Sequence, residues 1–179
     1  MNALEHLAGI HRVANESRHQ DRRYMLIALL ESSGWGDVTG SVLGIGLHTA
    51  TINHGFGGFH DTVRDDAGHS IATIDHGFGG WNDVIRDASG HTRATVDHGF
   101  SGHHDTIRDA SGHTVATVDH GFDGSHDVIR DSSGHTTATV DHGVGGFHDT
   151  VRDDSGHSVA TVDHSFDGSH DTIHFGYWL

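Results

Sequence analysis

The sequence contains no cysteine, no proline and no lysine, and each absence narrows the class of protein. Without cysteine, neither disulfide bonds nor thiolate metal sites can form. Proline would remove a hydrogen-bond donor from a strand, so its absence suits continuous β-ladders. All ten basic residues are arginine, against 25 acidic residues, and the formal net charge is −15. Because nucleic-acid binding requires clusters of cations, we expect no nucleic-acid partner.

Long apolar runs are also missing. The longest run, residues 24–30, has seven residues, whereas a membrane-spanning helix needs about 20. Residues 1–23 lack a basic start followed by an apolar core, so no secretory signal is recognised. We therefore expect no transmembrane segment. The sequence does not determine the compartment. We expect an extracellular or cell-surface location if the protein forms fibres, and a cytoplasmic one otherwise.

What the chain does contain is a period of 22 residues. A phrase close to Ala-Thr-Val-Asp-His-Gly-Phe recurs six times, and its histidine is spaced by 22 at every step: His54, His76, His98, His120, His142 and His164. A fixed period of this length predicts a repeat architecture, in which neighbouring copies complete one another's core.

The period divides the chain into four parts. Residues 1–32 carry apolar side chains three and four positions apart, which predicts an N-terminal helical segment. Residues 33–46 form a Gly-rich connector, and 47–174 hold six β-repeats. Residues 175–179 (Phe-Gly-Tyr-Trp-Leu) read as an aromatic C-terminal cap.

One copy contains two predicted strands. Residues 91–100 alternate, with Ala94, Val96 and Phe100 on one face, which is predicted to pack against something repeated. A second strand covers 104–109 and leads into a tight Asp-Ala-Ser-Gly-His turn. The most variable position lies on the opposite face of the first strand and is predicted to face solvent: Ile71, Arg93, Val115, Thr137 and Val159.

Two strands and two turns per copy allow two architectures. The preferred prediction is an all-β β-solenoid of six 22-residue coils, with equivalent residues stacked about 4.8 Å apart. The alternative is an antiparallel hairpin meander, open or closed into a barrel. Alternation around Ile107 directs Asp105 and Asp109 inward in a solenoid, where they need protonation, a partner or a metal. Alternatively, these two aspartates lie at the corners of the solenoid, where their side chains cap the backbone amides of the turns.

The repeating strand-turn-strand unit with Gly-rich turns resembles the curlin-type repeat of bacterial functional amyloids. The resemblance covers residues 47–174 and rests on the period and the pattern. It implies a β-solenoid that assembles into an extracellular fibre.

Histidine is the residue that offers chemistry, because 19 of the 22 histidines lie in the repeats. The preferred prediction is a ladder of neutral rings, each hydrogen-bonded to its neighbour or to an aspartate such as Asp97 or Asp105. The alternatives are that the rings bind a metal or make no specific interaction. No cofactor is required, but imidazole and carboxylate would suit Zn²⁺, Cu²⁺ or Ni²⁺. The candidate metal ligands form two columns: His54, His76, His98, His120, His142 and His164, and His60, His104, His126, His148 and His170.

Catalysis is not expected. Ser111, His113 and Asp109 recur together in similar turns, which is more typical of turn chemistry than of a triad. The predicted function is structural: a self-assembling subunit of a rod or fibre, present as a homo-oligomer or filament. The alternatives are a His-rich protein that binds or buffers divalent metals, and a ligand- or glycan-binding repeat scaffold.

Overall fold

The computed structural model describes residues 49–176, except residues 101 and 123. The predicted helical segment (1–32) and connector (33–46) lie outside the described residues, as do residues 177–179 of the predicted cap. Phe175, the first residue of that cap, is the last residue of a strand and packs against the core.

Twelve strands make up the part of the fold that the structure describes. They are β1 (Thr49–His54), β2 (His60–Asp65), β3 (Ser70–His76), β4 (Asn82–Asp87), β5 (Thr92–His98), β6 (His104–Asp109), β7 (Thr114–His120), β8 (His126–Asp131), β9 (Thr136–His142), β10 (His148–Asp153), β11 (Ser158–His164) and β12 (His170–Phe175). In residues 49–176, two short 3-10 helices, η2 (Phe56–Gly58) and η3 (Phe78–Gly80), lie in loops. Within the described part of the chain, no helix is long and apolar enough to cross a membrane.

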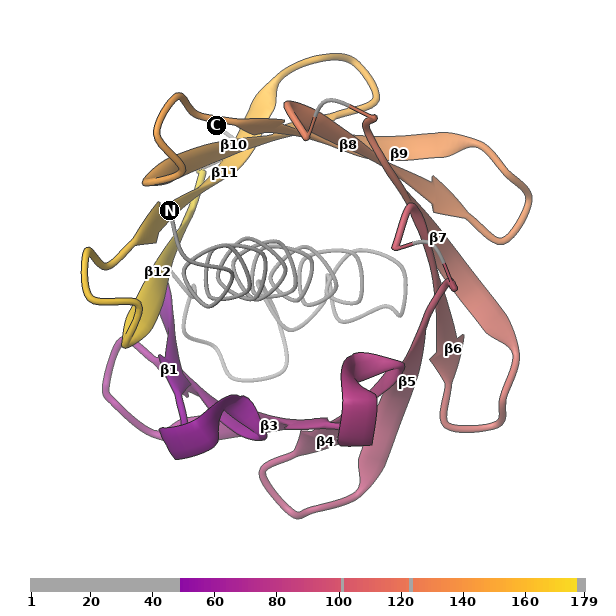
Figure 1. The fold of residues 1–179 in the computed structure, drawn as a ribbon. Helices are drawn as coiled ribbons and strands as arrows, with labels where there is room; N and C mark the ends of the chain where they lie inside the picture. Colours follow the sequence, from indigo (N-terminus) through magenta and orange to yellow (C-terminus); the bar gives the residue numbers. More distant parts are fainter. Residues whose placement is uncertain (1–48, 101, 123, 177–179) are drawn as a thin grey trace, which may run out of the picture.

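The strands form one closed antiparallel barrel (Figure 1). Each strand pairs with its neighbours in sequence, and β1 pairs with β12 to close the circle. The prediction of a β-solenoid is therefore wrong, and the alternative of a meander closed into a barrel is confirmed. Tight reversals between successive described strands, from β1 to β12, cause the difference. Equivalent residues of successive repeats lie two strands, or about 9–10 Å, apart instead of stacking directly.

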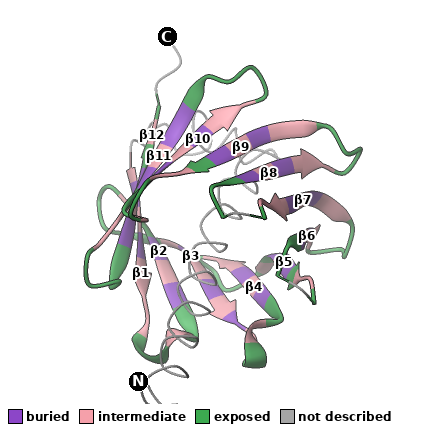
Figure 2. Ribbon diagram, turned by 45° about the horizontal axis from the view of Figure 1, so that its top comes forward, coloured by how far each residue is buried: buried purple, intermediate pink, exposed green. Residues whose placement is uncertain are grey.

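Alternate residues of each strand form the buried face of this barrel (Figure 2). Its apolar members are alanine, valine and isoleucine in one continuous cluster, with side chains such as Val63, Ile74 and Val96 at 0% exposure. Burying each valine or isoleucine stabilises the fold by about 1.5–3 kcal/mol. Because the repeat supplies the same small set of side chains each time, the buried face has similar composition on every hairpin.

The turns after even-numbered strands have the chemistry that the sequence predicts. In the first, the N–H of Asp65 donates to the carbonyl of His69 (3.0 Å) and that of Gly68 donates to Asp65 (2.9 Å). Gly68 has a φ of 81°, a left-handed conformation that glycine adopts without strain. The equivalent Asp109 accepts the backbone N–H of His113 (2.9 Å), which holds the pKa of Asp109 below its ordinary value. Asp109 thus caps a turn.

The most variable position of the repeat is a β-bulge. Val63 lies opposite Ala72 and Arg64 opposite Ser70, so Ile71 has no residue across from it. The same shift recurs in the pairings of β4 with β5, β6 with β7, β8 with β9 and β10 with β11. A position without a cross-strand partner places few demands on its side chain. The predicted solvent-facing position is exposed at Arg93, whereas Val159 there is buried.

Candidate functional site

The strand register brings a histidine and an aspartate together at one end of every hairpin. Each odd-numbered strand ends in histidine, and each even-numbered strand has aspartate as its second residue. In the pairing of β5 with β6, His98 lies directly opposite Asp105. The six aspartates belong to the inward face and are 0–2% exposed: Asp61, Asp83, Asp105, Asp127, Asp149 and Asp171.

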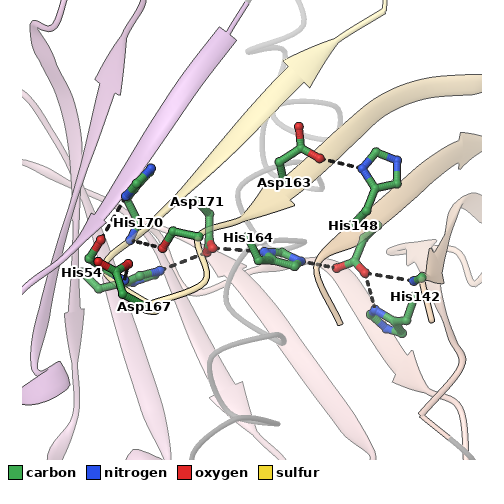
Figure 3. A network of polar contacts seen from close by, with 12 residues as sticks. His54, His142, His148, Asp163, His164, Asp167, His170 and Asp171 are labelled. Atoms are coloured by element: carbon green, nitrogen blue, oxygen red, sulfur yellow. Dashed lines mark hydrogen bonds and ion pairs between the residues drawn. The ribbon is translucent and has the colours of Figure 1, made fainter. Parts of the chain in front are cut away.

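These residues form a continuous ring around the barrel, here called the His–Asp ring. Every histidine contacts the aspartate of the following strand through Nδ1 and that of the preceding strand through Nε2, at 2.8–3.4 Å. The contact between His54 Nε2 and Asp171 Oδ2 (2.9 Å) closes the ring across β1 and β12. Figure 3 shows this part, from His142 through His164 and Asp171 to His54. The first column of predicted histidines is thus brought together.

The contacts define the protonation state of the ring. A neutral imidazole has one donor and one acceptor nitrogen, and a carboxylate only accepts. When the aspartates are ionised, both nitrogens of each ring histidine face a hydrogen-bond acceptor and both must carry a proton, which makes the histidines imidazolium ions. Six cations and six anions alternate, and the ring as a whole is neutral. The predicted contact of histidine with Asp105 is present, at His98 and His120, but the predicted neutral rings do not fit two carboxylate contacts per ring.

The pKa values agree with this assignment. Burial alone would lower the pKa of His54, but hydrogen bonds to Asp171 and Asp61 outweigh it and raise the pKa to about 9. The same causes raise the pKa of His98 and of His142 to about 9. Burial would raise the pKa of Asp127, whereas the two adjacent histidines lower it to about 2. The pKa values of Asp61, Asp83 and Asp105 are lowered for the same reason.

The second column of predicted histidines lies on the outer face, and the structure does not bring it together. His60, His104 and His148 each contact one aspartate of the next strand at 2.6 Å. His126 and His170 instead lie beside the hydroxyl groups of Ser125 and Ser169. Arginines of the even strands complete this outer layer; Arg108, for example, donates to Asp97 (3.1 Å) and Thr114 (3.0 Å). Among the described residues, no group of three or more ligands able to hold a metal ion occurs.

Directly beyond the His–Asp ring, the loops carry an exposed set of apolar side chains, here called the apolar rim. Its members are 93–108% exposed: Phe56, Phe78, Phe100, Phe122, Val144 and Phe166. The prediction that Phe100 shares the packed face of Ala94 and Val96 is wrong. β5 ends at His98, and the loop then turns the phenylalanine out of the barrel wall.

Further aromatic side chains extend the rim between neighbouring loops. Trp81 stacks on Phe100 with ring centroids 5.8 Å apart, and Phe147 stacks on Phe166 at 6.0 Å. Trp81 and Phe147 themselves remain about half exposed. Sequence reasoning missed the rim because it continued the alternation of the strand into the loop. The available signal was the phenylalanine that recurs two positions after the last histidine of the strand, in five of the six copies.

Comparisons with known proteins show the fold and not the function. No protein-family profile matches the chain, and no curated protein matches it. The X-ray structure of a protein from Arabidopsis thaliana is similar, with a TM-score of 0.56 and 12% sequence identity, over 72% of this chain and 81% of that one. The chain is therefore an all-β repeat protein with a regular strand-turn-strand unit. The resemblance to curlin receives no support from these comparisons.

Proposed function

We propose that this protein is a structural subunit that associates with itself through the apolar rim. The observation that carries the proposal is the rim: similar apolar side chains on all six loops at one end, almost fully exposed to water. Apolar side chains that are exposed together at one end of a molecule mark interaction surfaces, because burying them releases ordered water.

The closed barrel directs association to that end. Every described strand already has a hydrogen-bonded neighbour on both sides. Added strands at a sheet edge, the usual route to β-sheet fibres, therefore have no edge to join in the described barrel. The outer face is covered with polar groups that pair with one another, such as Arg130 with Asp119. The metal-buffering and glycan-binding alternatives have no comparable observation among the described residues.

Analytical ultracentrifugation tests the proposal directly. The wild-type protein is expected to sediment as a species larger than one chain, and the triple variant Phe78→Ser, Phe122→Ser, Phe166→Ser as a monomer. Since these side chains are exposed, the variant should retain the far-ultraviolet spectrum and melting temperature of the wild type. The matched control places serine at the opposite end (Ala67→Ser, Ala88→Ser, Ala110→Ser) and should associate normally. A monomeric wild type, or a triple variant that still associates, would contradict the proposal.

A further inference from the structure

The two ends of the barrel differ in chemistry. All loops after odd-numbered strands lie at the end with the apolar rim, and all turns after even-numbered strands lie at the other end. Among the described residues, that second end has five turns whose largest apolar side chain is alanine: residues 65–69, 87–91, 109–113, 131–135 and 153–157. These turns carry seven aspartates, whereas the sequence places two in the six rim loops. The barrel therefore has one apolar end and one acidic end.

We propose that two copies of the chain associate head to head, apolar rim against apolar rim, in a closed dimer. This inference rests on the proposed self-association and specifies its geometry. A contact between identical surfaces uses the same patch on both copies, so it is complete after two subunits. Head-to-tail stacking would generate a filament, but it would place phenylalanines against the acidic turns, where Asp66 and Asp154 are exposed. The acidic ends of a head-to-head dimer point away from each other, which avoids like-charge repulsion.

The rim is large enough for a stable dimer. It contains five phenylalanines and one valine, and a phenylalanine buries about 150–250 Å². A standard protein interface buries about 800 Å² per partner. The five phenylalanines supply an area of that order, and Trp81 and Phe147 add to it.

The rim is also shaped to meet a copy of itself. Equivalent loops recur with the period of the repeat, so the exposed side chains are distributed around the whole circle and not on one side. Stacking of Trp81 on Phe100 and of Phe147 on Phe166 restricts these rings before association. Side chains that are already ordered lose less entropy when they bind.

Single cysteines test the geometry, because the chain has none of its own. Val144→Cys places a thiol on the rim, and Ser133→Cys places one at the acidic end; both positions are exposed. With a short bismaleimide linker, Val144→Cys should give several-fold more cross-linked dimer than Ser133→Cys. Adding Phe122→Ser and Phe166→Ser to the rim cysteine should remove the product. A mixture of the two cysteine variants should give no cross-link between positions 144 and 133.

The outcomes separate this inference from the proposed function. Cross-links between positions 144 and 133, with particles that grow as concentration rises, would retain self-association and overturn the head-to-head dimer. A wild type that sediments as a monomer would overturn both. A monomer that pellets with phosphatidylcholine vesicles, and loses this binding in the Phe78→Ser, Phe122→Ser, Phe166→Ser variant, would instead identify the rim as a membrane-docking surface.

Discussion

The barrel presents the same pair of residue types on its two faces, and the two faces differ in what those pairs can do. His104 and Asp105 are consecutive in β6, so they point to opposite sides of the sheet. On the outer face, His104 lies 2.6 Å from Asp119, with side chains 53% and 44% exposed. On the inner face, His98 lies 3.1 Å from Asp105, with side chains 14% and 1% exposed.

The strength of these ion pairs depends on burial and on the number of oppositely charged partners, and not on the distance alone. The outer pair is shorter but water screens it, and exposed ion pairs contribute about 0–1 kcal/mol. The ring pairs are removed from water, and each charge has two partners of opposite sign. Removing one buried charge leaves its partners uncompensated, which is the costly case. Substituting a charged residue of the ring should therefore lower the stability of the protein much more than substituting one on the outer face.

The largest expected effect is the loss of one ring carboxylate. Asp105→Asn keeps the shape of the side chain but leaves His98 and His120 without a shared anion, and it should lower the free energy of unfolding by about 3–5 kcal/mol. The matched variant Asp97→Asn removes the partner of Arg108 on the outer face and should cost about 0–1 kcal/mol. Urea denaturation followed by circular dichroism measures both. If both variants lowered the free energy of unfolding equally, the buried ring would contribute no more to stability than the outer pairs.

The second effect is a dependence of stability on pH. The folded pKa of His54, His98 and His142 is about 9, above the ordinary 6.5. A raised pKa contributes stability that is complete below pH 6.5 and is lost as pH rises toward 9. Asp61, Asp83, Asp105 and Asp127 have lowered pKa values, about 2 for Asp127, so their contribution is complete above pH 3.8 and declines toward pH 2.

The melting temperature should therefore be highest between about pH 4 and 6.5 and fall toward pH 9. Scanning calorimetry across this range is the measurement, and the Asp105→Asn variant should show a shallower alkaline decline. A melting temperature that rises between pH 6.5 and 9 would contradict the pairing of these histidines with aspartates.

The smallest effect is the response to salt. Because ions screen exposed charges and reach buried ones poorly, 1 M sodium chloride should erase the small stability difference between wild type and Arg108→Ala. The larger difference between wild type and Asp105→Asn should persist. Melting temperatures at low and high salt give both comparisons. If salt removed the ring effect as well, the ring would have to be open to water.

Local structure within one repeat could be predicted from the sequence. Alternation in residues 91–100 and 104–109 predicted β5 and β6. The Asp-x-Ser-Gly-His pattern predicted the turn after Asp109. These signals are local, because the side-chain period of a strand and the left-handed glycine of a turn act over a few residues. The same alternation directed Asp105 inward and in need of a partner, which is where the structure places it.

Closure of the barrel could not be predicted in the same way. A repeat gives each copy similar neighbours whether the copies stack or curl, so the period fits both architectures. The pairing of β1 with β12 brings together His54 and Asp171, which are 117 positions apart, and no local signal specifies it. The ring follows from closure, since each histidine needs an aspartate on both sides. The apolar rim was missed because the strand pattern stops at His98, before Phe100.

The most direct test of the account is the protonation state of the ring histidines. Two-dimensional long-range ¹H–¹⁵N nuclear magnetic resonance distinguishes imidazolium from the two neutral tautomers. At pH 8, between the ordinary pKa of histidine and the value of about 9 for His98, the account predicts six imidazolium side chains. Histidine-to-glutamine variants at positions 54, 76, 98, 120, 142 and 164 should each remove one of these signals. Ring histidines that are neutral at pH 8 would contradict the central claim that alternating charges encircle the barrel.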